Sequence, residues 1–166
     1  MEAEPFILFG TDHLLAILAV ILISLVVPYY LKKTPLITKR KFGYVLACIL
    51  ILNELVKPYY HTQFFGYDLL KVLPFHMCAL SAFSISFFLL TNKRIFYEVA
   101  FFWGIGGGLM ALLQPDTPLD FPDPVFIIFY LSHGGMLLAI GHASIALKNR
   151  PNLDSVKRAI VVSLIV

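Results

Sequence analysis

The sequence predicts an all-α polytopic membrane protein, a bundle of six or more transmembrane helices. Of its 166 residues, 59% are hydrophobic and only 14% are charged, whereas soluble domains are about half apolar and roughly a quarter charged. Apolar stretches long enough to cross a hydrocarbon core about 30 Å thick recur along the chain. We therefore expect one transmembrane domain over residues 1–166, embedded in the cell membrane as a multi-pass protein and surrounded by membrane lipids.

Six apolar segments are predicted to be helical. They cover about residues 11–31, 42–60, 68–90, 95–113, 124–147 and 156–166. The sixth is too short to cross a membrane, so we expect the chain to be truncated inside that helix. A cleaved signal peptide normally begins with a basic residue, and no basic residue precedes the first segment here. The first segment is therefore expected to remain as a helix.

Lysines and arginines predict the orientation of the helices, because cytoplasmic loops carry an excess of both. All except Lys57 and Lys71 fall in or beside the connections after the first, third and fifth segments. The opposite side carries Asp116, Asp120 and Asp123 in a proline-rich connector. We expect an N-terminus outside and basic loops in the cytoplasm. Because the basic residues are divided among short loops, they require no nucleic-acid partner.

Several polar side chains fall inside the apolar segments, where ionisable groups are costly and usually functional. They are His13, Asn53, Glu54, His76, Cys78, His133 and His142. With the predicted orientation, all but His142 fall in the outer half of the membrane. This shared depth predicts one polar pocket rather than unrelated positions.

Helix geometry favours Cys78 and His133 as partners. His76 and Cys78 are two residues apart and so do not face each other on a helix, which makes His76 a poor base for this thiol. At about 1.5 Å per residue, Cys78 lies about 15 Å below a helix start at Asp68, and His133 about 13 Å below one at Pro124. The two side chains are therefore expected to meet at one level.

Pro74 is expected to kink the third segment. Such a break would also point a local helix N-terminus towards Cys78, and an N-terminus favours a thiolate. Ser81, one turn after Cys78, is the alternative nucleophile.

Ordinary structural roles suit the same residues. A buried cysteine is most often an inert hydrophobe, and Cys48, which has no polar neighbour, is expected to be one. Glu54 suits an ion pair with Lys57 three residues later. His133 suits a hydrogen bond to a carbonyl, and His13 suits an interfacial position at a helix end.

No cofactor and no metal ion are expected from the motifs. The run GIGGG at residues 104–108 lacks the preceding strand and the spacing of a dinucleotide-binding loop. Gly104 and Gly108 instead form a face of small residues for close helix packing. The chain has two cysteines, Cys48 and Cys78, and this number excludes a metal site built on cysteine pairs.

Three motifs carry a resemblance to known families. They are LPFHMCAL (73–80), FFWGIGGGLMALLQPD (101–116) and FIIFYLSHGG (126–135). In their order and spacing, over about residues 10–160, the chain resembles the YwaF-type bacterial integral membrane proteins. It is similar to a eukaryotic transmembrane acyltransferase family of lipid metabolism and, more distantly, to the androgen-induced membrane hydrolases of fatty-acid esters.

The resemblance implies a bundle of six or seven helices. It also implies a catalytic cysteine and histidine, which fall on Cys78 and His133. The distant hydrolases use a threonine that has no clear equivalent in this chain, so transfer is favoured over hydrolysis.

We therefore expect a lipid acyltransferase. Cys78 would form an acyl-thioester, and His133 would act as base while the acyl chain passes to a lysolipid. His76, Asn53 or the backbone near Gly134 would donate to the oxyanion.

Other functions fit the same residues. A proton-coupled transporter would depend on Glu54 or His13, and a small-molecule binder would need no catalysis. Water in place of the lysolipid would make the protein a lipid hydrolase. A metal protein would use His13, His76, His133 and Glu54.

Overall fold

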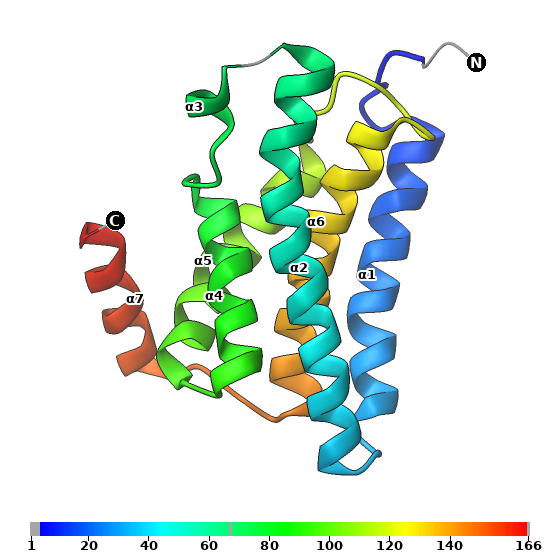
Figure 1. Ribbon diagram of the computed structural model, residues 1–166. Coiled ribbons are helices and arrows are strands. Elements are labelled where there is room, and N and C mark those ends of the chain that lie inside the picture. Colours follow the sequence, from blue (N-terminus) through cyan, green and yellow to red (C-terminus); the bar gives the residue numbers. More distant parts are fainter. Residues whose placement is uncertain (1–3, 67, 166) are drawn as a thin grey trace.

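The structure, a computed structural model, describes residues 4–66 and 68–165 and is built from helices (Figure 1). In chain order they are α1 (Thr11–Leu31), α2 (Leu36–Phe65), α3 (Leu69–Val72), α4 (Met77–Thr91), α5 (Arg94–Leu113), α6 (Pro124–Gly141), the π-helical η1 (His142–Ala146) and α7 (Leu153–Ile165). Within the described ranges no β-strand occurs, apart from an isolated bridge between Pro5 and Leu119. The prediction of an all-α fold is confirmed.

Four helical stretches are long and apolar enough to cross a membrane. They are Thr11–Leu31, Leu36–Gln63, Arg94–Leu113 and Pro124–Ala146. α4 is a shorter apolar helix beside them. The outer faces of these helices are apolar and exposed: Leu14, Leu18 and Leu25 of α1 are each about half exposed. Such faces suit contact with lipid chains.

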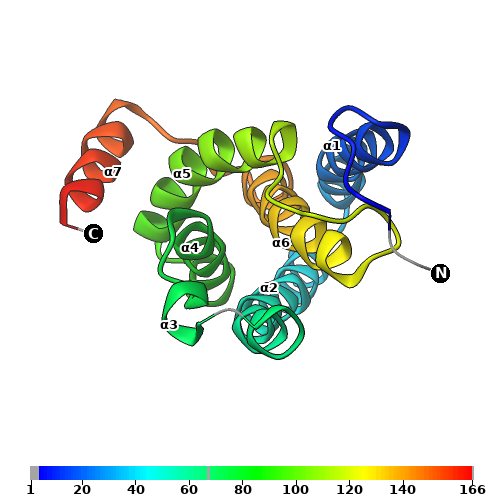
Figure 2. The same ribbon diagram turned by 90° about the horizontal axis from the view of Figure 1, so that it is seen from above.

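α6 lies at the centre of the bundle, and α1, α2, α4 and α5 surround it (Figure 2). Glycine allows the closest of these contacts. A Cβ on Gly104 would lie 2.5 Å from the Ile140 side chain, and one on Gly108 would lie 2.9 Å from Met136. The predicted small-residue face of α5 is therefore confirmed, and it packs on α6.

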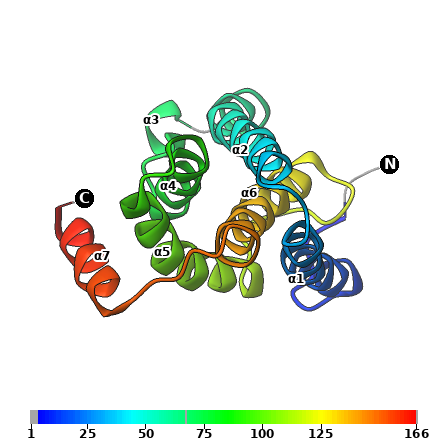
Figure 3. The same cartoon turned by 90° about the horizontal axis from the view of Figure 1, so that it is seen from below.

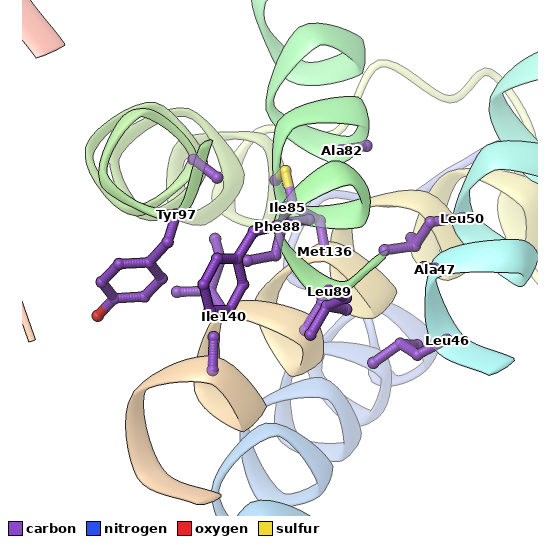
Figure 4. Packing of buried hydrophobic residues seen from close by; sticks show 13 residues of the cluster. Leu46, Ala47, Leu50, Ala82, Ile85, Phe88, Leu89, Tyr97, Met136 and Ile140 are labelled. Carbon is purple, nitrogen blue, oxygen red and sulfur yellow. The ribbon is translucent and has the colours of Figure 1, made fainter. Parts of the chain in front are cut away.

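The main hydrophobic core lies between α2, α4, α5 and α6 (Figure 4). Leu50 of α2, Ile85 and Phe88 of α4 and Met136 of α6 meet there with almost no exposed surface. Several of its other members are alanines. Small side chains let membrane helices approach closely, and close packing is a main source of their association.

The three basic connections lie at one end of the bundle, the lower end in Figure 1 and the near end in Figure 3. They join α1 to α2, α4 to α5, and η1 to α7. The predicted grouping of these loops on one side is thus confirmed. The proline-rich connector between α5 and α6 lies at the opposite end.

α7 lies at the edge of the bundle against α5 (Figure 3). Its attachment is polar. Glu98 of α5 is fully buried and accepts from the Arg158 guanidinium at 2.6 Å, while Arg94 pairs with the same carboxylate at 2.8 Å. Trp103 donates its indole N–H to the Ser163 hydroxyl at 2.8 Å.

The third predicted segment, a continuous helix over residues 68–90, is wrong. The chain forms the single turn α3, leaves helical conformation at Leu73, and resumes at Met77. Pro74 lies in this break, because its ring excludes a continuous helix. Asp68 does cap a helix, since its side chain accepts from Leu70 N, but that helix is only α3. The depth calculated from Asp68 therefore does not hold.

Other boundaries moved outward. α2 begins six residues before the expected start and extends five residues beyond the expected end, at Phe65. Pro58 lies inside this helix without ending it. α7 begins at Leu153, ahead of residue 156, and Val166 lies outside the described residues.

Candidate functional site

A cavity of about 370 Å³ lies near the end of the bundle away from the basic loops. Its walls come from the end of α2, from α3 and the break that follows it, from the start of α4, from the end of α5 and from the first half of α6. The lining residues are Glu54, Lys57, His61, Val72, Pro74, His76, Cys78, Ala111, Gln114, Asp116, Val125, Ile128, Phe129 and His133. Charged and polar groups thus share this space with an apolar wall.

Cys78 is the second residue of α4 and is a free, half-buried thiol. Its sulfur lies close to α5, because a Cβ on Gly107 would be 3.7 Å from it. The break at Pro74 produces the helix N-terminus that the sequence predicted beside this cysteine. Unpaired N–H groups at a helix N-terminus favour negative charge there, whereas partial burial opposes it.

His76 is the residue that caps α4. Its Nδ1 accepts from the backbone N–H of Ala79 at 3.3 Å. A ring nitrogen that accepts carries no proton, so in the neutral imidazole the proton is on Nε2. His76 therefore keeps an Nε2–H donor that the cap does not use, and the residue is part of the cavity lining.

His133 has the opposite arrangement. Its Nδ1 lies 3.1 Å from the carbonyl oxygen of Phe129 and, since a carbonyl only accepts, this nitrogen carries the proton. The Nε2 of the neutral ring is then a free base. His133 is buried, with 6% of its surface exposed, and its ring packs on that of Phe129 at 4.3 Å. The carbonyl bond expected for this histidine is thus present, and it leaves Nε2 as the nitrogen that can accept a proton.

A buried ion pair forms the α2 wall of the cavity. The Lys57 ammonium lies 2.8 Å from Glu54 Oε2 and donates to the Ser132 hydroxyl at 3.1 Å. Ser132 in turn donates to the other oxygen of Glu54. The predicted pairing of Glu54 with Lys57 is confirmed. Apart from its place before His133, nothing in the sequence indicated that Ser132 would bind this pair.

His13 and Asn53 lie outside the lining of this cavity. His13 is fully buried, accepts from Phe9 N at 2.8 Å, and places Nε2 2.7 Å from the carbonyl oxygen of Leu112. It thereby ties the N-terminal segment to the end of α5. Asn53 is buried on α2, and its amide nitrogen has no hydrogen-bond partner in the described part of the chain.

Other candidate positions have structural partners. The Ser81 hydroxyl donates to the Met77 carbonyl oxygen at 2.8 Å. Gly134 faces α1, where a Cβ would lie 2.7 Å from Val20. His142 is fully buried and places Nε2 3.0 Å from the Lys39 carbonyl oxygen. No three His, Cys, Asp or Glu side chains of residues 4–66 and 68–165 gather as metal ligands would.

The chain was compared with models of protein families. The model of the TMEM164 family matches residues 8–166. The chain belongs to the TMEM164 family. No curated protein and no solved structure matches the chain.

The TMEM164 family match covers every residue of the cavity. It agrees with the expectation of a membrane protein, which the apolar helices also support. Of the residues singled out from the sequence, the fold brings Glu54, His76, Cys78 and His133 of this TMEM164 family member together around one space.

Proposed function

We propose that this protein transfers acyl groups between membrane lipids, with Cys78 as nucleophile and His133 as base. The observation that carries the proposal is that both side chains line one cavity of about 370 Å³. A thiol and an imidazole that line one cavity are the parts that nucleophilic acyl transfer requires. The motif resemblance to YwaF-type proteins and to the lipid acyltransferases gives independent support.

In the first half-reaction, the Cys78 thiol gives its proton to His133 Nε2. The thiolate attacks the carbonyl carbon of a fatty-acyl ester, so that a C–S bond forms and the ester C–O bond breaks. The departing alkoxide takes the proton back from His133 and leaves as a lysolipid. The product on the protein is an acyl-thioester.

In the second half-reaction, the hydroxyl of an acceptor lysolipid gives its proton to His133 and attacks the thioester carbonyl. A new C–O bond forms, the C–S bond breaks, and Cys78 leaves as a thiolate that recovers its proton from His133. Both tetrahedral intermediates carry an oxyanion. The Nε2–H of His76 is the donor best suited to stabilise it, because its Nδ1 is occupied by the cap.

The apolar wall of the cavity supports a lipid substrate. Val72, Val125, Ile128 and Phe129 line it beside the polar groups, a combination that accommodates an ester next to its acyl chain. We place the whole chain in the cell membrane as one domain with its N-terminus outside. The cavity then lies in the outer half of the bilayer, and lipids enter it sideways between helices.

Lipid analysis of expressing cells tests this function. Cells carry wild type, Cys78→Ala, His133→Ala or Cys48→Ala. Cys48 is the matched control because it is also a free thiol but is exposed on α2, away from the cavity. Wild type and Cys48→Ala should change the acyl composition of the lipids equally, while the other two should not. Identical profiles in all four would reject the mechanism.

The acyl-thioester gives a second, direct readout. Purified protein is incubated with a phospholipid whose acyl chain carries an alkyne. We expect covalent labelling that hydroxylamine removes, present in Cys48→Ala and absent in Cys78→Ala. Release of free fatty acid without any lysolipid acceptor would instead identify a hydrolase, in which water replaces the acceptor hydroxyl.

A transporter is the second candidate, because the buried Glu54–Lys57 pair borders the cavity and intramembrane ion pairs often serve proton movement. A transporter would show pH-coupled uptake that Glu54→Gln abolishes and Cys78→Ala leaves intact. Uptake lost in Cys78→Ala, or absent in wild type, would contradict it.

A further inference from the structure

The opposite end of the bundle from the cavity carries a strong positive field. The basic residues there are Lys32, Lys33, Lys39, Arg40, Lys41, Lys93, Arg94, Lys148, Arg150, Lys157 and Arg158. In the described part of the chain, the carboxylates at this end are Glu98 and Asp154. Both are already paired, Glu98 with two arginines and Asp154 with Lys157. The remaining positive charges are uncompensated, so this end attracts anions.

A groove of about 800 Å³ opens among these charges. Lys32 at the end of α1 borders one side, and Lys148 and Arg150 border the other. None of the groove's lining residues is acidic. Among the residues that the structure describes, these three have no ion-pair partner. Phe101 and Ile145 supply an apolar floor. The groove thus combines three available cations with a surface that suits a lipid glycerol or acyl chain.

The backbone at Lys148 is a second, independent observation. Lys148 has φ of +59°, in the left-handed region where glycine is favoured at the end of a helix. The conformation is fixed, because Asn149 N donates to the Ala143 carbonyl oxygen at 3.0 Å and the Tyr97 hydroxyl donates to the Asn149 carbonyl oxygen at 3.0 Å. A lysine at such a position is strained, and strained residues gather at functional sites.

The π-helix η1 leads directly into this segment. π-Helical turns are rare and often occur at functional sites. In this chain the turn over His142–Ala146 places Ser144 and Ile145 in the groove. The positions of Lys148 and Arg150 are therefore determined by an irregular but hydrogen-bonded connection.

We propose that this groove binds a phosphate group, carried by an anionic phospholipid or by a soluble phosphate ester. Basic pockets between membrane helices on the cytoplasmic side suit anionic headgroups, and basic loops mark the cytoplasmic side. The lipid would lie in the leaflet opposite the one that serves the Cys78 cavity. The site is separate from the acyl chemistry and does not depend on it.

Binding is measured by native mass spectrometry of the purified protein with phosphatidylglycerol, with zwitterionic phosphatidylcholine, and with glycerol 3-phosphate. Lys148→Gly and Arg150→Gln test the groove. Lys41→Gln is the matched control, because it removes one positive charge from the same end but outside the groove. Thermal unfolding of each variant is recorded in parallel.

Phosphatidylglycerol should bind more tightly than phosphatidylcholine, and Lys148→Gly and Arg150→Gln should each weaken it about fivefold. Lys148→Gly should unfold at the same or a higher temperature, because glycine relieves the backbone strain. If Lys148 had only a structural role, its substitution would not weaken binding while leaving thermal stability unchanged or higher. If millimolar glycerol 3-phosphate competes with the lipid, the ligand is a soluble ester. If it does not compete, the ligand is a lipid. Equal binding of the two lipids without any binding of glycerol 3-phosphate, or equal losses in Lys41→Gln and Lys148→Gly, would overturn the proposal.

Discussion

Cys78 at the start of α4 and His133 in the middle of α6 border the same cavity, although they are far apart in the sequence. The surroundings of each side chain are determined by residues close to it in the sequence. The break at Pro74 places the thiol at a helix N-terminus, and the Phe129 carbonyl holds the proton of His133 on Nδ1. Substitutions around the cavity can separate what each neighbour contributes.

His76 is expected to have two roles that substitutions can separate. Asparagine is among the best helix N-caps, so His76→Asn should keep α4 stable while removing the Nε2–H donor. Acyl transfer by His76→Asn should then fall about a hundredfold or more, as when an oxyanion donor is lost. His76→Ala should also lose about 1 kcal/mol of stability with the cap. Enzyme turnover and the thermal midpoint measure the two effects. Full activity in His76→Asn would limit His76 to capping.

Removing only Glu54 should destabilise the protein more than replacing both Glu54 and Lys57 by apolar residues. Glu54 is fully buried, and Glu54→Leu would leave the Lys57 ammonium with only the Ser132 hydroxyl. Loss of one partner of a buried pair costs about 3–5 kcal/mol, whereas apolar replacement of both is often neutral. We expect Glu54→Leu to unfold far below wild type and Glu54→Leu/Lys57→Met to recover most of the loss. Equal midpoints for the two variants would contradict this account.

Much of this architecture could be predicted from the sequence, because apolar length and loop charge reflect the bilayer directly. Pro74 could be recognised as a disturbance, but whether a proline kinks or ends a helix depends on its neighbours. Pro58 lies inside α2 and Pro74 does not lie inside any helix. The geometric argument for Cys78 and His133 assumed a continuous third helix, but His76 caps α4 from outside it. The motif resemblance names the same two residues without that assumption.

Other features depend on contacts that no local pattern contains. His13 looked like a pocket residue, yet its partner is the Leu112 carbonyl at the end of a distant helix. The Arg158 guanidinium that reaches Glu98 is likewise remote in sequence. The only local signal was the spacing of Arg94 and Glu98, four residues apart on α5. The left-handed Lys148 had no signal, since lysine does not favour that conformation.

Glu98 should determine whether α7 stays on α5. Its carboxylate binds Arg158 of α7 through two nitrogens and also accepts from the Ser155 hydroxyl. In Glu98→Gln the bidentate charged pair is lost, so α7 should detach while the core between α2, α4, α5 and α6 remains. Hydrogen exchange of α7 should accelerate, with the other helices unchanged.

Lys157→Gln is the control for α7. Lys157 is exposed and lies 3.5 Å from the exposed Asp154, a pair worth little in water. Amide hydrogen exchange of α7 in Lys157→Gln should match that in wild type. Unchanged protection of α7 in Glu98→Gln would show that the Trp103–Ser163 hydrogen bond and the remaining contacts suffice to hold it.

Gly141 should be the least replaceable glycine of α6. A Cβ there would lie 2.5 Å from the backbone carbonyl oxygen of Ser24 on α1, and a backbone atom cannot move aside as a side-chain end can. Gly141→Ala should therefore push α1 away from α6 and cost about 1–3 kcal/mol. Gly106→Ala is the matched control, because nothing lies within 4 Å of its added Cβ. Alanine is the better helix former by about 0.5–1 kcal/mol, so Gly106→Ala should be as stable as wild type or slightly more so. Thermal unfolding in detergent compares the two, and a Gly141→Ala midpoint equal to that of Gly106→Ala would show that α1 is free to shift.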